Sequence, residues 1–115
     1  MTMMRAAAFV EPGRIELVDK PIPDVGPNDA LVRITTTTIC GTIGHEPVGV
    51  IEKLGSNVQG YQEGQRVIAG AICPNFSSYA SQDGLSSQDG GCACHGYKPM
   101  GGWRFGNTID GTQAE

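Results

Sequence analysis

Residues 30–55 read ALVRITTTTICGTIGHEPVGVIEKLG and carry the clearest signals for the fold. Residues 30–39 are dominated by β-branched side chains, which pack well on a pleated strand. A second strand is expected over 45–55, where Gly49 predicts a bulge or a close approach of two backbones. The stretch therefore predicts two strands with three reactive side chains at their connection, namely Cys40, His45 and Glu46.

The flanking residues also read as short strands separated by turns. Residues 4–10 and 14–18 form a predicted hairpin, because Glu-Pro-Gly at 11–13 suits a turn and 14–18 alternates polar with apolar side chains. Residues 20–30 hold three prolines and are expected to be a loop, whereas 65–69 reads as a short strand. With no convincing long helix, the sequence predicts a mainly β domain with long loops.

The later part of the chain is polar and rich in glycine. Residues 74–91 contain the tetrapeptide Ser-Gln-Asp-Gly twice, at 81–84 and 87–90, and are expected to form one long polar loop. A short strand or turn is expected around Trp103 to Phe105. A strand–GxGxxG–helix unit is not found, so the sequence predicts that a dinucleotide-binding Rossmann domain is absent.

Composition narrows the class of protein. The chain has 115 residues with 17 Gly and 7 Pro, which disfavours a helical bundle, and a net charge of −4. The negative charge and the lack of a basic patch argue against a nucleic-acid partner. No apolar run approaches the ~20 residues of a membrane span, and the N-terminus carries no secretory signal. We therefore expect a cytoplasmic protein without a membrane partner.

Cys40, His45 and Glu46 are a candidate metal site. A thiolate, an imidazole and a carboxylate are all competent zinc ligands, and a catalytic zinc keeps three protein ligands and one open position. Chain reversal between the two strands would bring the three side chains together, with the hydroxyl of Thr42 among them. On the pattern alone, a buried cysteine near a surface histidine and glutamate is the more frequent arrangement.

A second cluster contains Cys73, Cys92, Cys94 and His95. Four such residues could hold a structural zinc, but the Cys-x-Cys spacing is not the usual Cys-x-x-Cys pair. Thiols in a loop are the simpler interpretation, and both alternatives stay open. The two Ser-Gln-Asp-Gly copies lack the alternating acidic residues and closing glutamate of a calcium loop, so we interpret them as turns.

Four motifs together resemble the N-terminal, GroES-like domain of the zinc-dependent medium-chain alcohol dehydrogenases. They are Cys40-Gly41-Thr42, Gly44-His45-Glu46-Pro47-Val48-Gly49, Leu54-Gly55-Ser56 and Gly64-Gln65-Arg66-Val67. The opening residues are similar to the first strands of this family, and residues 94–115 resemble its bacterial secondary-alcohol subgroup. The resemblance implies a GroES-like, partly open β-barrel with long loops.

The family's functional residues carry over at the matching positions. Cys40, His45 and Glu46 match the ligands of the catalytic zinc, and Thr42 matches the hydroxyl that relays the proton of the alcohol. In the family, zinc polarises the oxygen of a small alcohol or carbonyl substrate. Hydride then passes to NAD(P) held by a separate Rossmann domain.

The chain also departs from the family pattern. Only Ile43 separates Thr42 from Gly44, where the family has a much longer connection with a further Asp-x-His. Gln65 replaces the Asp that is usual in the family. The fourth zinc-pocket residue of the subgroup would lie past Glu115. The usual four-cysteine pattern of the structural-zinc lobe is not found in the sequence. Residues 1–115 are therefore expected to be one incomplete GroES-like zinc-binding domain.

The sequence thus predicts an abridged piece of a zinc-dependent alcohol dehydrogenase that does not turn over NAD(P) by itself. The alternative is a non-enzymatic zinc-binding or self-associating β domain, and a scaffold without metal is a third. The hairpin and the strand over 45–55 are expected to share one sheet whose closing strands are missing. Because an unpaired sheet edge favours strand addition, we expect a homo-oligomer.

Overall fold

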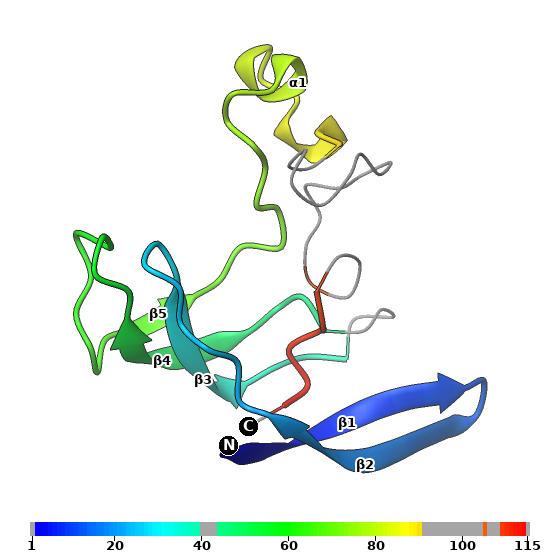
Figure 1. Ribbon diagram of the computed structural model, residues 1–115. Helices are drawn as coiled ribbons and strands as arrows, with labels where there is room; N and C mark the ends of the chain where they lie inside the picture. The colour runs from blue at the N-terminus through cyan, green and yellow to red at the C-terminus, as the bar shows by residue number, and fades with distance from the viewer. Residues whose placement is uncertain (1, 40–43, 91–104, 106–108, 115) are drawn as a thin grey trace.

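The protein is described here by a computed structural model that covers residues 2–39, 44–90, 105 and 109–114. In these residues, strands form two antiparallel sheets, and two short helical turns follow them (Figure 1). The elements are β1 (Met3–Glu11), β2 (Arg14–Pro21), β3 (Ala30–Thr36), β4 (Val48–Leu54), β5 (Arg66–Ile68), α1 (Tyr79–Gln82) and the 3-10 helix η1 (Ser86–Gln88). The expected mainly β fold class is confirmed, although the sheets do not join into a closed barrel among the described residues.

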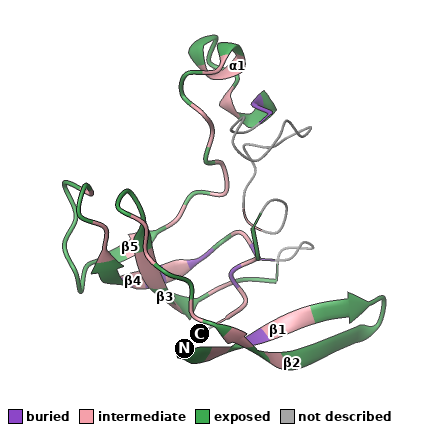
Figure 2. Cartoon of the chain, in the orientation of Figure 1, coloured by how far each residue is buried: buried purple, intermediate pink, exposed green. Residues whose placement is uncertain are grey.

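Strands β1 and β2 form the expected hairpin, which projects from the rest of the molecule (Figure 1). Gly13 at the turn has φ +83°, a conformation that glycine adopts without the strain of a side chain. The register pairs Phe9 with Ile15 and Ala7 with Leu17, so these four side chains lie on one face. Figure 2 shows that the outer part of this hairpin is largely exposed.

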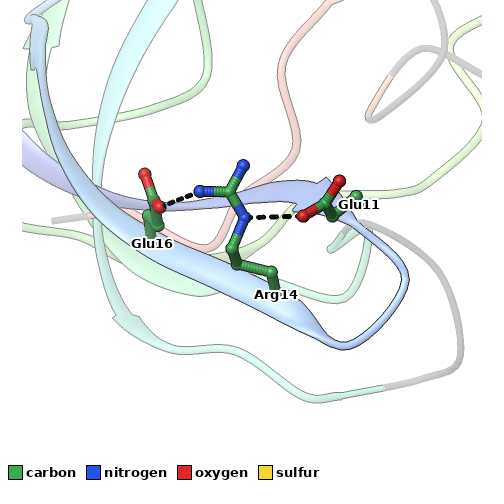
Figure 3. A network of polar contacts seen from close by, with 3 residues as sticks. All are labelled: Glu11, Arg14 and Glu16. Atoms are coloured by element: carbon green, nitrogen blue, oxygen red, sulfur yellow. Dashed lines mark hydrogen bonds and ion pairs between the residues drawn. The ribbon is translucent and has the colours of Figure 1, made fainter.

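The tip of the hairpin is charged on its opposite face. Arg14 contacts Glu11 through Nε at 3.0 Å and Glu16 through Nη1, as Figure 3 shows. All three side chains are about half exposed, so solvent screens these ion pairs and each adds at most ~1 kcal/mol. The network therefore marks the solvated face of the tip and contributes little to stability.

The second sheet has the order β3-β4-β5 and holds Ile51 in the core, 3% exposed. The expected role of Gly49 is confirmed. A Cβ at this position would meet Val32 Cγ1 at 2.4 Å and the carbonyl oxygen of Arg33 at 2.5 Å. The register between β3 and β4 also shifts next to this pairing, between Ile34 and Thr36. Glycine is thus required because two backbones approach closely there.

The expectation that the hairpin and the 45–55 strand share one sheet is wrong. Strand β4 already pairs with β3 on one edge and β5 on the other, so it has no edge for the hairpin. The C-terminal segment, residues 109–114, adds to β1 instead. The backbone N–H of Ala7 donates to the carbonyl oxygen of Gln113 at 2.9 Å, and Ala6 bridges Ala114. This contact covers Ala6, which is 9% exposed.

Residues 74–91 were expected to be one long polar loop, and for the described residues 74–90 this is only partly correct. They form a small lobe that contains α1 and η1, drawn at the top of Figure 1. Ser78 caps α1, because its hydroxyl accepts the backbone N–H of Ser81 at 3.2 Å.

Of the predicted strand around 103–105, only Phe105 is described, and it bridges Ile109. No described helix is long and apolar enough to span a membrane.

Candidate functional site

The connection between β3 and β4 holds the candidate site. The two strands are antiparallel with Thr36 opposite Val48, so the chain reverses within residues 37–47, as the sequence predicts. Thr38 Oγ1 donates a hydrogen bond to Glu46 Oε2 across this reversal. Thr35 Oγ1 likewise donates to the carbonyl oxygen of Val48 at 3.2 Å. Hydroxyls of the threonine run therefore tie the residues before Cys40 to those after Gly44.

The C-terminal segment holds the backbone just before His45. The carbonyl oxygen of Gly44 accepts the N–H of Thr112 at 2.9 Å. A Cβ at Gly44 would meet Gln113 Cγ at 2.9 Å and Thr112 N at 3.0 Å, and φ at Gly44 is +85°. Thr112 is buried, and its hydroxyl lies 3.4 Å from that of Thr37. Gly44 is thus fixed by contacts that only a glycine permits.

His45, Glu46 and Pro47 differ in exposure. Pro47 is fully buried, and its carbonyl oxygen accepts the N–H of Ala69 at 3.3 Å. The His45 side chain is half-buried with Nδ1 shielded from solvent, whereas Glu46 is exposed. Hydrogen bonds thus hold the backbone on both sides of the two candidate ligands, which favours a defined geometry for any bound group.

The structure places only some of the predicted site residues. Cys40 and Thr42 lie outside the described residues, as do Cys92, Cys94 and His95 of the second cluster. Cys73 is described, and it is exposed. Within the described part of the chain, no three His, Cys, Asp or Glu side chains gather at one point. The three-ligand hypothesis thus stays a prediction.

Two supporting residues were not singled out from the sequence. Thr38 donates a hydrogen bond to Glu46, a predicted ligand. Thr112 donates one to the backbone of Gly44, the residue before His45. The threonine run at 35–38 is a weak signal for the first, because it reads equally well as strand propensity. Nothing local distinguishes Thr112, since its role depends on a partner 68 positions away.

Comparison with known proteins agrees with this architecture. The family model described as the alcohol dehydrogenase GroES-like domain matches residues 41–115. An alcohol dehydrogenase of Cupriavidus necator is 69% identical over 98% of this chain. An NADP-dependent isopropanol dehydrogenase of Entamoeba histolytica is 35% identical over 99% of it. The solved zinc-dependent alcohol dehydrogenase 2 of Streptococcus pneumonia superimposes with a TM-score of 0.71 and 30% identity over 97% of the chain.

The chain spans only about a third of these proteins, namely 37%, 34% and 34% of their respective lengths. The alignment with the Cupriavidus protein also runs over 136 positions, more than the 115 residues present here. The relative thus carries residues within the shared span that have no counterpart, in agreement with the expected shortening. The match over residues 41–115 and the likeness in fold show that the chain belongs to the zinc-dependent medium-chain alcohol dehydrogenase family, through its GroES-like domain.

Proposed function

We propose that this chain is the zinc-binding part of an alcohol dehydrogenase that interconverts a small secondary alcohol and its ketone. One observation carries the proposal: the hydroxyl of Thr38 donates a hydrogen bond to the carboxylate of Glu46 across the β3–β4 reversal. Thr38 lies two positions before Cys40, and Glu46 is itself a predicted ligand. This contact supports an arrangement in which the residues flanking Cys40 and Glu46 run side by side. The isopropanol dehydrogenase relative supports a secondary alcohol as the substrate class.

The donor set suits zinc. Cys40, His45 and Glu46 would supply a thiolate, an imidazole and a carboxylate, which are ordinary zinc ligands. The half-buried ring of His45 and the solvent-facing Glu46 suit a site that is closed by protein on one side and open to substrate on the other. When bound, zinc supplies a Lewis acid that polarises the oxygen of the alcohol. Thr42 would accept the proton of the alcohol at its hydroxyl and pass it towards solvent.

Neighbouring residues would orient these ligands. Thr38 holds one carboxylate oxygen of Glu46, which restricts the rotation of that side chain and leaves the other oxygen available. Gly44 and Pro47 hold the backbone on both sides of His45 and Glu46. Such support matters because ligand geometry decides both metal affinity and the position of the substrate.

The hydride acceptor would be NAD(P), bound by a Rossmann domain of the parent protein rather than by residues 1–115. The relatives are about three times the length of this chain, which leaves room for such a domain. We propose that residues 1–115 are one incomplete GroES-like domain and that the parent enzyme acts in the cytoplasm. The chain alone is then a metal-binding domain without turnover.

A self-associating β domain is the second candidate function. Ile15 and Leu17 are each 67% exposed on the edge strand β2, and Phe9 on the same face is 59% exposed. Burying such side chains against a second copy would be favourable by about 1.5–3 kcal/mol for each one fully buried. This candidate needs no substrate and is compatible with bound zinc.

Metal analysis of the purified chain tests the zinc assignment. We expect roughly one zinc per chain in the wild type and a loss of most of it in Cys40→Ala. Cys73→Ala removes an exposed thiol of the second cluster instead, so zinc lost in this variant and kept in Cys40→Ala would point to that cluster. Zinc should also leave on acidification, since the thiol and imidazole bind metal only when deprotonated. Equal zinc in the wild type and Cys40→Ala would refute the assignment.

A further inference from the structure

The tetrapeptide Ser-Gln-Asp-Gly occurs twice in the lobe of residues 74–90, as residues 81–84 and 87–90. Asp-Gly pairs are chemically labile, because glycine has no side chain to shield its amide nitrogen from the neighbouring carboxyl carbon. Both copies have the same residues up to the glycine, so their intrinsic reactivity is closely similar. Any difference between them in the native protein must come from the fold.

Asp83 lies in an open environment. It is exposed and forms the C-cap of α1, a helix of only four residues. Its backbone N–H donates to the carbonyl oxygen of Tyr79 at 2.9 Å, and Gly84 donates to Ser81 at 3.1 Å. A Cβ at Gly84 would meet nothing within 4 Å. A single helical turn is marginal in water, so this end of α1 opens at little cost.

Asp89 is enclosed instead. It is 2% exposed, and its Oδ2 accepts the backbone N–H of Asn75 at 2.8 Å. Gly90, which supplies the amide nitrogen of the second pair, is buried as well. Formation of the ring at this position would break the contact of the Asp89 carboxylate with Asn75 inside the lobe. Loss of this hydrogen bond leaves the part-buried N–H of Asn75 without its acceptor, which disfavours the reaction.

From this contrast we infer that Asp83 is a site of spontaneous isoaspartate formation in the native protein, whereas the fold protects Asp89. The amide nitrogen of Gly84 attacks Cγ of Asp83, and the carboxyl oxygen leaves with two protons as water to form a five-membered succinimide. Water then adds to the ring. Cleavage of the bond between the nitrogen and the main-chain carbonyl of Asp83 frees an α-carboxylate and leaves the chain connected through Cγ.

This change alters the end of α1. The isoaspartyl link adds one methylene to the main chain and moves a negative charge from the side chain to the former backbone carbonyl. The N–H of Gly84 can then no longer keep its geometry with Ser81, and the C-terminal end of the short helix is lost. The site therefore also marks where this lobe would first lose structure as the protein ages.

A third pair, Asp110–Gly111, provides an intermediate case. The carboxylate of Asp110 pairs with Lys20, although its side chain is 75% exposed. The pair belongs to the C-terminal segment, which hydrogen-bonds to β1 through Gln113. We expect its rate of isomerisation to lie between those of Asp83 and Asp89.

Peptide mapping after prolonged incubation at neutral pH tests the inference. Chymotrypsin cleaves after Tyr79, Leu85 and Tyr97, so Asp83 and Asp89 fall in separate peptides, 80–85 and 86–97. After alkylation of the cysteines, electron-transfer fragmentation distinguishes isoaspartate from aspartate. In the native protein we expect isoaspartate to form at least about tenfold faster in 80–85, which corresponds to only ~1.4 kcal/mol of extra protection at Asp89.

Two controls separate the effect of the fold from intrinsic reactivity. In concentrated urea, the two peptides should form isoaspartate at similar rates. Ser78→Ala removes the cap of α1 and should raise the rate at Asp83 but not at Asp89. Equal rates in the native protein, no isoaspartate at Asp83, or the same ratio in urea as in the native state would each overturn the inference.

Discussion

The backbone N–H of Thr112 donates a hydrogen bond of 2.9 Å to the carbonyl oxygen of Gly44. Through it, the C-terminal segment joins two parts of the fold. The same segment bonds to β1 through Gln113 and supports the backbone before His45 through Thr112. The C-terminal segment therefore holds the backbone next to His45, a predicted ligand.

Gly44→Ala should destabilise the protein more than Gly60→Ala does. Both glycines have positive φ, +85° and +81°, so each alanine adds a backbone strain of about 1–2 kcal/mol. Only at Gly44 would the added Cβ also meet Thr112 and Gln113, which adds roughly 1–3 kcal/mol. A Cβ at Gly60 meets nothing within 4 Å. Urea unfolding of both variants measures the difference, and equal losses would show that the contact with Thr112 is unimportant.

Thr38→Val should weaken zinc binding without much change in stability. The substitution keeps the shape of the side chain but removes the hydroxyl that holds Glu46. Loss of such a support typically weakens metal affinity ~10-fold or more. Thr35→Val is the matched control, because its hydroxyl bonds to the backbone of Val48 instead of a predicted ligand. Competition with a chromophoric chelator reports the affinities. If both variants bind zinc equally well, Thr38 does not orient a ligand.

The chain alone should show no NAD(P)-dependent oxidation of secondary alcohols. This prediction rests on the missing GxGxxG unit, since a dinucleotide needs such a loop at a helix N-terminus. Absorbance at the reduced nicotinamide band measures turnover, and calorimetric titration with NAD⁺ and NADP⁺ measures binding. A full-length alcohol dehydrogenase assayed alongside confirms that the conditions support catalysis. Clear binding of either dinucleotide would contradict the prediction.

Self-association is predicted to involve the exposed face of the hairpin. The reason first expected, an open edge on a sheet shared by the hairpin and the 45–55 strand, is wrong because the two lie in different sheets. Strand β2 is an edge strand among the described residues and exposes Ile15 and Leu17. We expect a concentration-dependent dimer that Ile15→Lys weakens by about tenfold or more, because an edge lysine opposes strand addition.

Light scattering over a dilution series measures this association. Leu85→Lys is the control, since Leu85 is 57% exposed but lies in the lobe of residues 74–90, away from both sheets. A wild-type chain that stays monomeric at every concentration, or equal effects of the two lysines, would exclude the hairpin as the interface.

The local elements and the family could be predicted from the amino-acid sequence alone. The Pro-Gly turn and the alternating residues 14–18 predict the hairpin, and the β-branched run predicts β3, because these signals act over neighbouring residues. Gly49 signals a close backbone approach, which the contacts with Val32 and Arg33 confirm. The Cys-Gly-Thr and Gly-His-Glu motifs identify the family because each is a run of neighbouring residues, although the connection between them is much shorter here than in the family.

The pairing of strand edges and the residues that support the site could be identified only in the folded chain. Pairing of β1 with residues near Gln113, and of Gly44 with Thr112, joins segments far apart in the chain, and no local pattern specifies such contacts. The two Ser-Gln-Asp-Gly copies likewise differ in a way that their sequence does not predict. Their residues are identical, yet Asp83 is exposed and Asp89 is buried against Asn75, because burial depends on what the rest of the chain packs around them.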